Sequence, residues 1–393
     1  IKKLTRGVLM YYKAYKFRLY PDSNQRMIIN KMLGCSRYIY NHYLSKMKDF
    51  GYVGAYTNIM NYTSNLKYKD TFLQEADSII IRQALFNLDN AFQKMFKEHS
   101  GYPRYKNKHS KCSYNTCAIY SKYKDKEYCN IEVDLNERMI KLPKLKWLKI
   151  RGYRNINKIV GKIKSATVER ESNGKYYVSL LYKQEDIKYK VIPKNVVGID
   201  LGIKKLLTLS DGTSYDNNKY LLKYEKRIKR KQRELSRKVK RSNNYYKCKK
   251  ELARLYTKLT NSRKYYIHKI TKNITDEYDI ITCEKLHTKN MIMEGTKNHL
   301  SKSITDASFN EIMRQLLYKS NYKGKYFYQV DEYYPSSQIC SVCNHQDKTY
   351  KDLNKREYKC NNCGMTLDRD LNASINIMFF GVVKVYKKLL GIG

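Results

Sequence analysis

The chain has 393 residues, and its 79 Lys and Arg residues outnumber its 36 Asp and Glu residues, which gives a formal net charge of +43. So large a charge destabilises a compact protein unless a polyanion neutralises it, and we therefore expect a nucleic acid as partner. No run of about 18 apolar residues and no signal peptide is present, so we expect no membrane partner and a cytoplasmic location, near the nucleoid in a prokaryote.

One strand and two helices are predicted in the first hundred residues. Residues 13–19 alternate in the manner of a strand, which Pro21 ends. Apolar residues recur at helical spacing over residues 24–47 and 76–97. A basic, aromatic loop follows at residues 102–111. Residues 1–10 precede the strand-like run and are interpreted either as an upstream extension or as an addition that is not native to the protein.

Short strands are predicted between residues 114 and 184, separated by turn-like sequences such as 135–138 and 173–175. The predicted strands cover residues 117–120, 130–135, 138–145, 162–171 and 175–183. We expect them to form a small β-barrel or sandwich that also includes the strand at 13–19. The two helices would then be an insertion into a β-rich domain.

The sequence VVGIDLGIKKLLTLSDG, residues 196–212, predicts an antiparallel hairpin with Asp200 near the end of its first strand. Residues 219–276 are helical and very basic, and like charges are too dense there for pairing within the helix. We expect a helical hairpin that faces nucleic acid. Its proposed contacts are Lys226, Arg227, Lys229 and Arg230.

Further along, an apolar strand at residues 278–286 carries Glu284, and a strand at 325–335 follows a predicted helix at 306–319. Two CxxC pairs come next. Their spacing is that of a zinc ribbon, in which four thiolates close a structural tetrahedral site. The predicted zinc ligands are Cys340, Cys343, Cys360 and Cys363.

The other six cysteines are scattered and are interpreted as small buried apolar residues or idle thiols. Cys112, Cys117 and Cys129 are an alternative second metal cluster, although no fourth ligand is evident.

Acidic residues occupy three prominent positions: Asp200, Glu284, and either Asp368 or Asp370 at the start of a predicted helix after the ribbon. Such positions converge in a ribonuclease-H-like sheet. Carboxylates lie close together as anions only when cations neutralise them, and oxygen ligands suit Mg²⁺ or Mn²⁺. Two such ions can activate water and stabilise the leaving oxygen of a phosphodiester.

Four motifs together resemble the TnpB family, the RNA-guided nucleases of insertion sequences that are related to type V CRISPR effectors and Fanzor proteins. They are VVGIDLGIKKLLTLSDG, IITCEKLH, YPSSQICSVC and CNNCGMTLDRDLNASINI. KAYKFRLYPDSNQRMIINKMLGCSRYIYN, ALFNLDNAFQKMFK and GYPRYK resemble the family's N-terminal region, so the resemblance covers residues 11–380.

The resemblance implies a multidomain α+β protein. Its parts would be an extension and first wedge strand at 1–20, a helical recognition domain at 21–110, a β-barrel wedge domain at 111–192, a RuvC nuclease domain with the basic hairpin at 193–335, a zinc ribbon at 336–366, and the last RuvC part with a tail at 367–393. The protein would act as a monomeric ribonucleoprotein. It would bind a guide RNA and cut double-stranded target DNA next to a short flanking motif.

By motif match, the catalytic acids and magnesium ligands are Asp200, Glu284 and Asp370, and Asp370 is preferred over Asp368. Arg369 would orient a carboxylate or phosphate, and Asn372 would cap or brace the site. The motif reads NAS where NAA is usual, and the small serine is expected to cause no loss.

Contacts to nucleic acid are also predicted in the helical domain. On the second helix they are Ser78, Arg82 and Gln83, which could reach a groove, and in the following loop Tyr102, Arg104 and Lys106. Three alternatives stay open: a miniature type V CRISPR effector, a nuclease-dead RNA-guided regulator, and a stand-alone RNA-binding zinc-ribbon protein. The intact acids disfavour the second, and the third would not need them.

Overall fold

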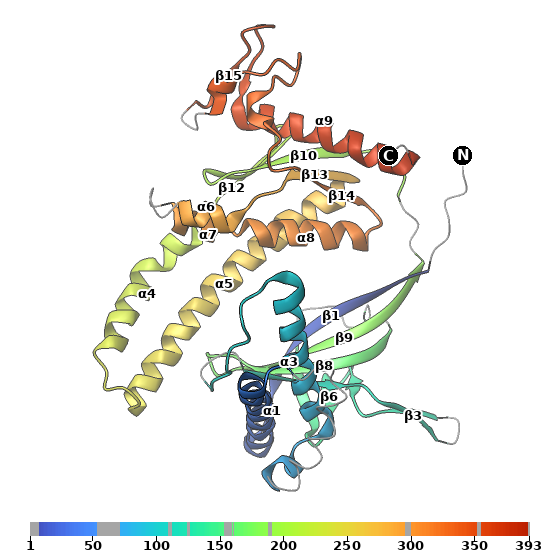
Figure 1. The fold of residues 1–393 in the computed structure, drawn as a ribbon, viewed down its shortest axis with the longest axis vertical. Coiled ribbons are helices and arrows are strands. Elements are labelled where there is room, and N and C mark those ends of the chain that lie inside the picture. The colour runs from blue at the N-terminus through green and yellow to red at the C-terminus, as the bar shows by residue number, and fades with distance from the viewer. Residues whose placement is uncertain are drawn as a thin grey trace. The chain divides into compact units, whose positions relative to one another are not determined.

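The computed structural model describes residues 8–52, 71–108, 112–123, 126–152, 159, 161–187, 191–294, 300–351 and 355–391. The described chain forms two compact units, an N-terminal unit of residues 8–186 and a C-terminal unit from residue 187 onwards (Figure 1). Both units mix helices and strands, as the multidomain α+β prediction requires. The predicted boundary between the wedge and RuvC domains, between residues 192 and 193, lies six residues after the boundary of these units. No described helix is both long enough and apolar enough to cross a membrane.

The helices and strands of the N-terminal unit are β1 (Val8–Tyr20), α1 (Ser23–Phe50), the 3₁₀ helix η1 (Thr71–Glu75), α3 (Ser78–Glu98), β2 (Cys112–Cys117), β3 (Tyr120–Tyr123), β4 (Lys126–Cys129), β5 (Glu132–Asp134), β6 (Met139–Leu142), β7 (Lys146–Arg151), β8 (Lys162–Arg170) and β9 (Tyr176–Ile187). Residues 1–7 of the predicted extension and residues 109–111 of the predicted loop lie outside the described residues.

Both predicted helices of the N-terminal unit are confirmed, and each begins at an aspartate that caps its first turn. Asp22 and Gln25 form a reciprocal capping box at the start of α1. Asp77 accepts the backbone N–H of Ile79 at the start of α3. The helices share an apolar core that includes Leu44 and Leu88.

Seven strands form the sheet of the N-terminal unit, in the order β2-β8-β9-β1-β7-β6-β5. β1 lies between β9 and β7, which confirms that the first strand joins the sheet across the helical insertion. A barrel or sandwich was predicted, but among the described residues the strand order is open, with β2 and β5 at its ends. The apolar face of the sheet packs instead against helix residues such as Ile29, Met32 and Ile80.

The prediction of one strand over residues 138–145 is wrong, because Pro143 interrupts it. Proline has no N–H for a strand ladder, and the chain turns there instead. Lys144 takes a left-handed conformation with φ 62°, and the N–H of Leu145 donates to the carbonyl of Leu142. β6 and β7 therefore pair as a hairpin on either side of this turn.

The main elements of the C-terminal unit are β10 (Val196–Leu201), β11 (Lys205–Leu209), β12 (Ser214–Asp216), α4 (Tyr220–Ser236), α5 (Asn243–Glu277), β13 (Ile280–Glu284), α6 (Thr288–Glu294), α7 (Ser301–Ala307), α8 (Phe309–Tyr322), β14 (Tyr326–Val330), η3 (Ser336–Gln338), η4 (Lys348–Lys351), β15 (Glu357–Lys359), β16 (Thr366–Asp368) and α9 (Arg369–Leu390). The predicted hairpins at 196–212 and 219–276 are β10–β11 and α4–α5.

A five-stranded sheet in the order β12-β11-β10-β13-β14 is the centre of the C-terminal unit. β10, β13 and β14 are parallel, whereas β11 and β12 are antiparallel to their neighbours. One face carries the apolar residues of β10 and β13, such as Ile199 and Ile281, and packs against α5 and α8. The other face is covered by α9, so the sheet lies between helices (Figure 1).

The single helix predicted over residues 306–319 is broken at Ser308, where the backbone has φ 56°. The carboxylate of Asp306, at the end of α7, gives the physical reason for the break. It is buried, it accepts the Nε–H of Arg263 at 2.5 Å, and it accepts the backbone N–H of Leu221 at 2.9 Å. These bonds tie α7 to the base of the basic hairpin, and α8 starts in a new direction.

Candidate active site and metal centre

Asp200 and Glu284 lie side by side at one edge of the five-stranded sheet. β10 and β13 are parallel and in register, with Ile199 opposite Cys283. Asp200 and Glu284 are the next residues along the two strands, so their side chains point to the same face. Parallel strands thus bring together two carboxylates that are distant in sequence.

Helix α9 lies directly on that face, because glycines allow the backbones to touch. A Cβ atom on Gly198 would lie 2.0 Å from the carbonyl oxygen of Ser374, and one on Gly381 would lie 2.3 Å from Cγ2 of Thr282. Gly198 and Thr282 each precede the acidic residue of their strand by two positions, and therefore share its face. The close approach fixes the start of α9 above the two carboxylates.

The two aspartates at the start of α9 have different roles. Asp368 is exposed and is the N-cap, since its Oδ1 accepts the backbone N–H groups of Asp370 at 3.0 Å and Leu371 at 3.1 Å. Asp370 lies in the first turn, where its charge acts on Asp200. The structure therefore groups Asp370, and not Asp368, with the strand-end acids.

The surroundings of Asp200 and Glu284 disfavour their ionised forms. Burial first, and then the charges of Glu284 and Asp370, raise the pKa of Asp200 well above its ordinary value. Burial raises the pKa of Glu284 to about 7. Because a nearby positive charge favours the ionised form of a carboxylate, a divalent cation held among these groups would reverse both shifts.

Arg369 supplies a fixed positive charge beside the acids, and this charge favours the ionised form of Asp200. The side chain is buried, and its guanidinium donates to Ser337 Oγ at 3.4 Å and to the carbonyl of Lys355 at 3.5 Å. The arginine thus connects the start of α9 to the turn before the first CxxC pair and to the segment between the two pairs.

The donor set fits hard divalent cations, since carboxylate oxygens are the ligands that Mg²⁺ and Mn²⁺ prefer. Asp200, Glu284 and Asp370 are only partly buried, so ions can reach them. They are less tightly grouped than the ribbon cysteines: in the described part of the chain, only those cysteines form a set of three or more potential ligands within 4.8 Å of one another. That wider spacing is compatible with two ions about 4 Å apart.

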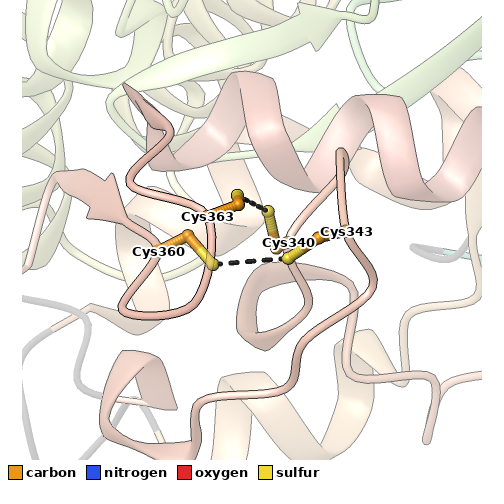
Figure 2. A group of neighbouring side chains, drawn as sticks. All are labelled: Cys340, Cys343, Cys360 and Cys363. Atoms are coloured by element: carbon orange, nitrogen blue, oxygen red, sulfur yellow. Dashed lines mark hydrogen bonds between the residues drawn. The ribbon is translucent and has the colours of Figure 1, made fainter.

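The four predicted zinc ligands converge, and Figure 2 shows their sulfur atoms facing one another across two loops. Their Sγ atoms all lie within 4.8 Å of one another. Cys340 and Cys363 are 3.6 Å apart, and Cys343 and Cys360 are 3.5 Å apart. Zinc–sulfur bonds of about 2.3 Å in a tetrahedron place sulfurs about 3.8 Å apart, so the cluster fits one zinc ion.

Local hydrogen bonds prepare one of these thiols for metal binding. The side chain of Asn362 and the backbone of His345 lower the pKa of the Cys343 thiol to about 6. Thiolates are the metal-binding form, so this environment favours a ligand at neutral pH. The second cluster considered for Cys112, Cys117 and Cys129 is absent from the described residues, where the ribbon set is the only such group.

Two buried asparagines of α9 hold the first cysteine knuckle. Asn372 accepts the backbone N–H of Ser341 at 3.0 Å and donates to the carbonyl of Ile339 at 2.7 Å. Asn376, one helical turn later, donates to the carbonyls of Ser336 and Ile339 at 2.8 and 2.7 Å. Asn372 was expected to cap or brace the carboxylate site, and the hydrogen bonds of its side chain are to this knuckle. No role was predicted from the sequence for Asn376. Its position one helical turn after Asn372 places both side chains on the same face of α9, and this spacing could have indicated it.

The hydroxyl of Ser374, where NAA is usual, donates to the carbonyl of Leu371 at 2.7 Å, so it leaves no unsatisfied polar group.

The basic hairpin presents its predicted contacts to solvent. Lys226, Arg227, Lys229 and Arg230 are all exposed, while Ile228 packs inward. An open hollow of about 780 Å³ on α4 is lined by Lys226, Lys229, Arg230, Arg233, Glu234, Arg237 and Lys238. The hairpin is closed by the ammonium of Lys231, which bonds Glu234 at 2.8 Å and Glu251 at 2.7 Å. A cationic surface of this kind, called the basic ridge below and made up of Lys226, Arg227, Lys229 and Arg230, suits phosphate groups.

The predicted contacts in the N-terminal unit are also mostly exposed. Ser78 and Arg82 lie on the outer side of α3, and Gln83 is partly buried.

Tyr102 and Arg104 are exposed in the loop after α3. Lys106 differs, because burial lowers its pKa and its ammonium lies 3.9 Å from the centre of the Tyr40 ring. The side chain of Asn41 bonds both backbone groups of Lys106 at 2.8 Å, so this lysine helps to anchor the loop.

Comparison with known proteins gives three family matches. Residues 179–294 match the family described as "Probable transposase", residues 309–377 match "Cas12f1-like, TNB domain", and residues 10–50 match "Helix-turn-helix domain". In this structure the last region contains the strand β1 and the single helix α1.

Relatives match along most of the chain. "Putative RNA-guided DNA endonuclease InsQ" of Escherichia coli is 31% identical, covering 94% of this chain and 92% of the relative. A "Putative RNA-guided DNA endonuclease" of Streptomyces pristinaespiralis is also 31% identical, covering 94% and 89%. "TnpB-like protein L79" of Acanthamoeba polyphaga mimivirus is 27% identical over 57% of this chain and 45% of the relative.

Among solved structures, "Cryo-EM structure of the Cas12f1-sgRNA-target DNA complex" contains a chain of similar fold, with a TM-score of 0.56 and 16% identity. It covers 94% of this chain and 99% of that chain. The near full-length identity to the bacterial relatives agrees with the motif resemblance, and the chain belongs to the TnpB family.

Proposed function

We propose that this protein is an RNA-guided DNA endonuclease of a transposable element. It binds a guide RNA derived from the transposon end and cuts double-stranded DNA next to a short flanking motif. The observation that carries the proposal is the convergence of Asp200, Glu284 and Asp370 at one sheet edge. The net charge of +43 and the names of the relatives support nucleic-acid partners.

Asp200, Glu284 and Asp370 would hold two Mg²⁺ or Mn²⁺ ions. When bound, such ions activate water and neutralise charge on the attacked phosphate. The protein supplies the alignment: β10 and β13 fix two carboxylates in register, and α9 adds the third from above. Arg369 favours the ionised, ligating form of Asp200, whereas burial and the charges of Glu284 and Asp370 oppose it.

One structural Zn²⁺ would occupy the cysteine cluster, in keeping with the sulfur spacing. Its four protein ligands leave no open position, so it takes no direct part in the chemistry. Asn372 and Asn376 connect the first knuckle to α9. Through them, a closed ribbon would keep the first turn of α9, and hence Asp370, in position.

We assign residues 193–335 and 367–393 to a RuvC domain, residues 336–366 to its zinc ribbon, residues 111–192 to the wedge domain and residues 21–110 to the recognition domain. The exposed cations of α4 would contact the phosphates of the guide or of the guide–target duplex. We propose that the working form is a monomeric ribonucleoprotein in the cytoplasm.

Purification of the protein with its RNA, followed by sequencing of that RNA and a cleavage assay on matching DNA, tests this function. The expected result is one RNA species that ends in a variable guide, and cutting that requires Mg²⁺ or Mn²⁺. A specific RNA without cutting would favour the nuclease-dead regulator. Ribosomal or mixed RNA without cutting would favour the stand-alone RNA-binding protein, and an RNA read from a CRISPR array would favour the miniature effector.

A further inference from the structure

At the end of β14 the chain leaves the sheet beside Glu284. β13 and β14 are parallel, with Glu284 opposite Val330, and the N–H of Lys285 donates to the carbonyl of Val330 at 3.0 Å. Neighbouring strands are about 4.8 Å apart, and three further residues reach at most about 11 Å. Residues up to 333 therefore stay within about 16 Å of Glu284, measured between Cα atoms.

Tyr333 stands in this segment with its ring in solvent. It is 85% exposed, more than any other large apolar or aromatic side chain of the described residues. Its backbone is nevertheless fixed, because Asp331 Oδ1 accepts the N–H of Tyr333 at 3.0 Å and the carbonyl of Asp331 accepts the N–H of Tyr334 at 3.1 Å. The Tyr334 ring packs 4.5 Å from the ring of Phe380 on α9.

A histidine–carboxylate pair flanks this tyrosine. His287, three residues after Glu284, contacts the carboxylate of Glu332 through Nε2. The His287 side chain is 53% exposed and that of Glu332 is 23% exposed, so the imidazole is the more accessible partner. The contact connects the loop after β13 to the turn after β14, at the residue that precedes Tyr333 in the chain.

A single exposed tyrosine is ordinary on a protein surface, and so is a single ion pair. Here both features follow the ends of β13 and β14, at the edge of the sheet that carries Glu284. The backbone of the tyrosine is held by its hydrogen bond to Asp331. An aromatic face binds a nucleobase by stacking only when the base is not enclosed in a duplex. Histidine nitrogens donate hydrogen bonds to phosphate oxygens.

We propose that Tyr333 and His287 form a subsite for one unpaired nucleotide of the DNA strand that enters the carboxylate site. The Tyr333 ring stacks on the base, His287 contacts the adjoining phosphate, and Glu332 positions His287. This inference rests on the proposed function and deepens it, since it names side chains that hold the strand beside the carboxylates.

Steady-state cleavage of a single-stranded oligodeoxynucleotide by the guide-loaded protein tests the subsite. Tyr333→Ala is expected to raise KM about tenfold while kcat changes little, because stacking contributes to ground-state binding. Tyr333→Phe restores the KM, since the ring is kept. His287→Ala is expected to raise KM as well. Glu332→Gln, which only removes the partner of His287, is expected to raise KM by a smaller factor. The control Tyr128→Ala, which removes a half-exposed tyrosine of β4, leaves KM unchanged.

A second measurement does not depend on cutting. The guide-loaded Asp200→Ala protein is irradiated with an oligodeoxynucleotide that carries 5-iododeoxyuridine, and the adduct is located by mass spectrometry. An adduct on Tyr333 supports the subsite even if the protein cuts no DNA, an outcome that would refute the proposed function alone. Adducts only at other residues, together with a Tyr333→Ala protein of wild-type KM, would overturn the subsite and leave the nuclease intact.

Discussion

The four thiols of the ribbon and the three carboxylates at the sheet edge are both candidate metal ligands, but the chain assembles them differently. The thiols come from two loops of one short segment, and their sulfur atoms lie within 4.8 Å of one another. The carboxylates come from β10, β13 and α9, and only the tertiary fold brings them together. One cluster is therefore local in origin, whereas the other depends on the packing of the whole C-terminal unit.

Helix α9 connects the two clusters, since its first turn carries Asp370 and its next turns hold the first cysteine knuckle. The difference in origin predicts a difference in sensitivity. The thiol cluster is expected to fail as a unit when one ligand is removed. The carboxylate site is expected to respond also to substitutions far from any ligand, wherever they lift α9 from the sheet.

The largest effect is expected for the carboxylates themselves. Asp200→Ala, Glu284→Ala and Asp370→Ala are each expected to lower the DNA cleavage rate by roughly a thousandfold or more, while guided binding persists. Gel-shift and cleavage assays on the same preparations separate the two effects. Asp368→Ala is the matched control, because it removes only a helix cap that stabilises by about 1 kcal/mol. Normal cutting by Asp370→Ala, with loss in Asp368→Ala, would reverse the assignment.

Removal of one thiol is expected to have the next largest effect. Cys360→Ser is expected to abolish zinc binding, measured by elemental analysis, and to lower cleavage by about 10- to 100-fold, because the ribbon would no longer support α9. Solubility is expected to fall as well. Cys117→Ser, at a partly buried cysteine outside the ribbon, is the control and keeps its zinc. Fully active protein without zinc would refute the structural role of the metal.

The glycine contacts test whether α9 must touch the sheet. Gly198→Ala and Gly381→Ala each place a methyl group within 2.3 Å of existing atoms, and each is expected to lower the free energy of unfolding by about 1–3 kcal/mol. Cleavage is expected to fall with it, although no ligand is altered. Gly34→Ala is the control, because its added Cβ meets nothing within 4 Å. Equal stability of all three variants would show that α9 is not held by close contact.

The raised pKa of Glu284 predicts how the metal-free protein responds to pH. Burial raises this pKa from 4.5 to about 7, so the ionised carboxylate costs stability, and the cost grows as pH rises from 4.5 to 7 and then levels off. Glu284→Gln is therefore expected to be more stable than the wild type in EDTA above pH 7, by about 1–3 kcal/mol. Thermal melts at about pH 4.5 and pH 8 measure this gap, which Mg²⁺ is expected to reduce. A gap that is equal at both pH values would contradict the shift.

The smallest effect is expected on the basic ridge. Replacing Lys226, Arg227, Lys229 and Arg230 with alanine is expected to weaken nucleic-acid binding without changing the recognised sequence. The slope of log affinity against log salt is expected to become shallower by about 0.9 for each duplex phosphate that the variant no longer neutralises. Lys272→Ala is the control, because this exposed lysine of α5 does not line the hollow on α4. An unchanged slope would show that the ridge does not bind phosphates.

The sequence was sufficient for the elements whose signals are local. The CxxC spacing predicted the thiol cluster, and period and charge predicted α1, α3 and the α4–α5 hairpin. Strand-end position and motif resemblance together indicated Asp200, Glu284 and Asp370. The preference for Asp370 over Asp368 rested on the motif alone. The structure adds a physical reason, because Asp368 is the N-cap of α9.

Other features depended on interactions that no local pattern reports. Pro143 and Ser308 break a predicted strand and a predicted helix, and in the second case a buried aspartate bonds to distant segments. Gly198 and Gly381 look like ordinary strand and helix residues until α9 is placed on the sheet. The open order of the seven-stranded sheet likewise follows from helices that cover its apolar face.

The central claim is that an RNA chooses the DNA site and that the three carboxylates cut it. Its most direct test is cleavage by the purified ribonucleoprotein after the guide segment of its RNA has been replaced. We predict that the cut moves to the DNA that matches the new guide, that it requires Mg²⁺ or Mn²⁺, and that Asp200→Ala abolishes it. A fixed cut site that does not follow the guide, or cutting by RNA-free protein, would contradict the claim.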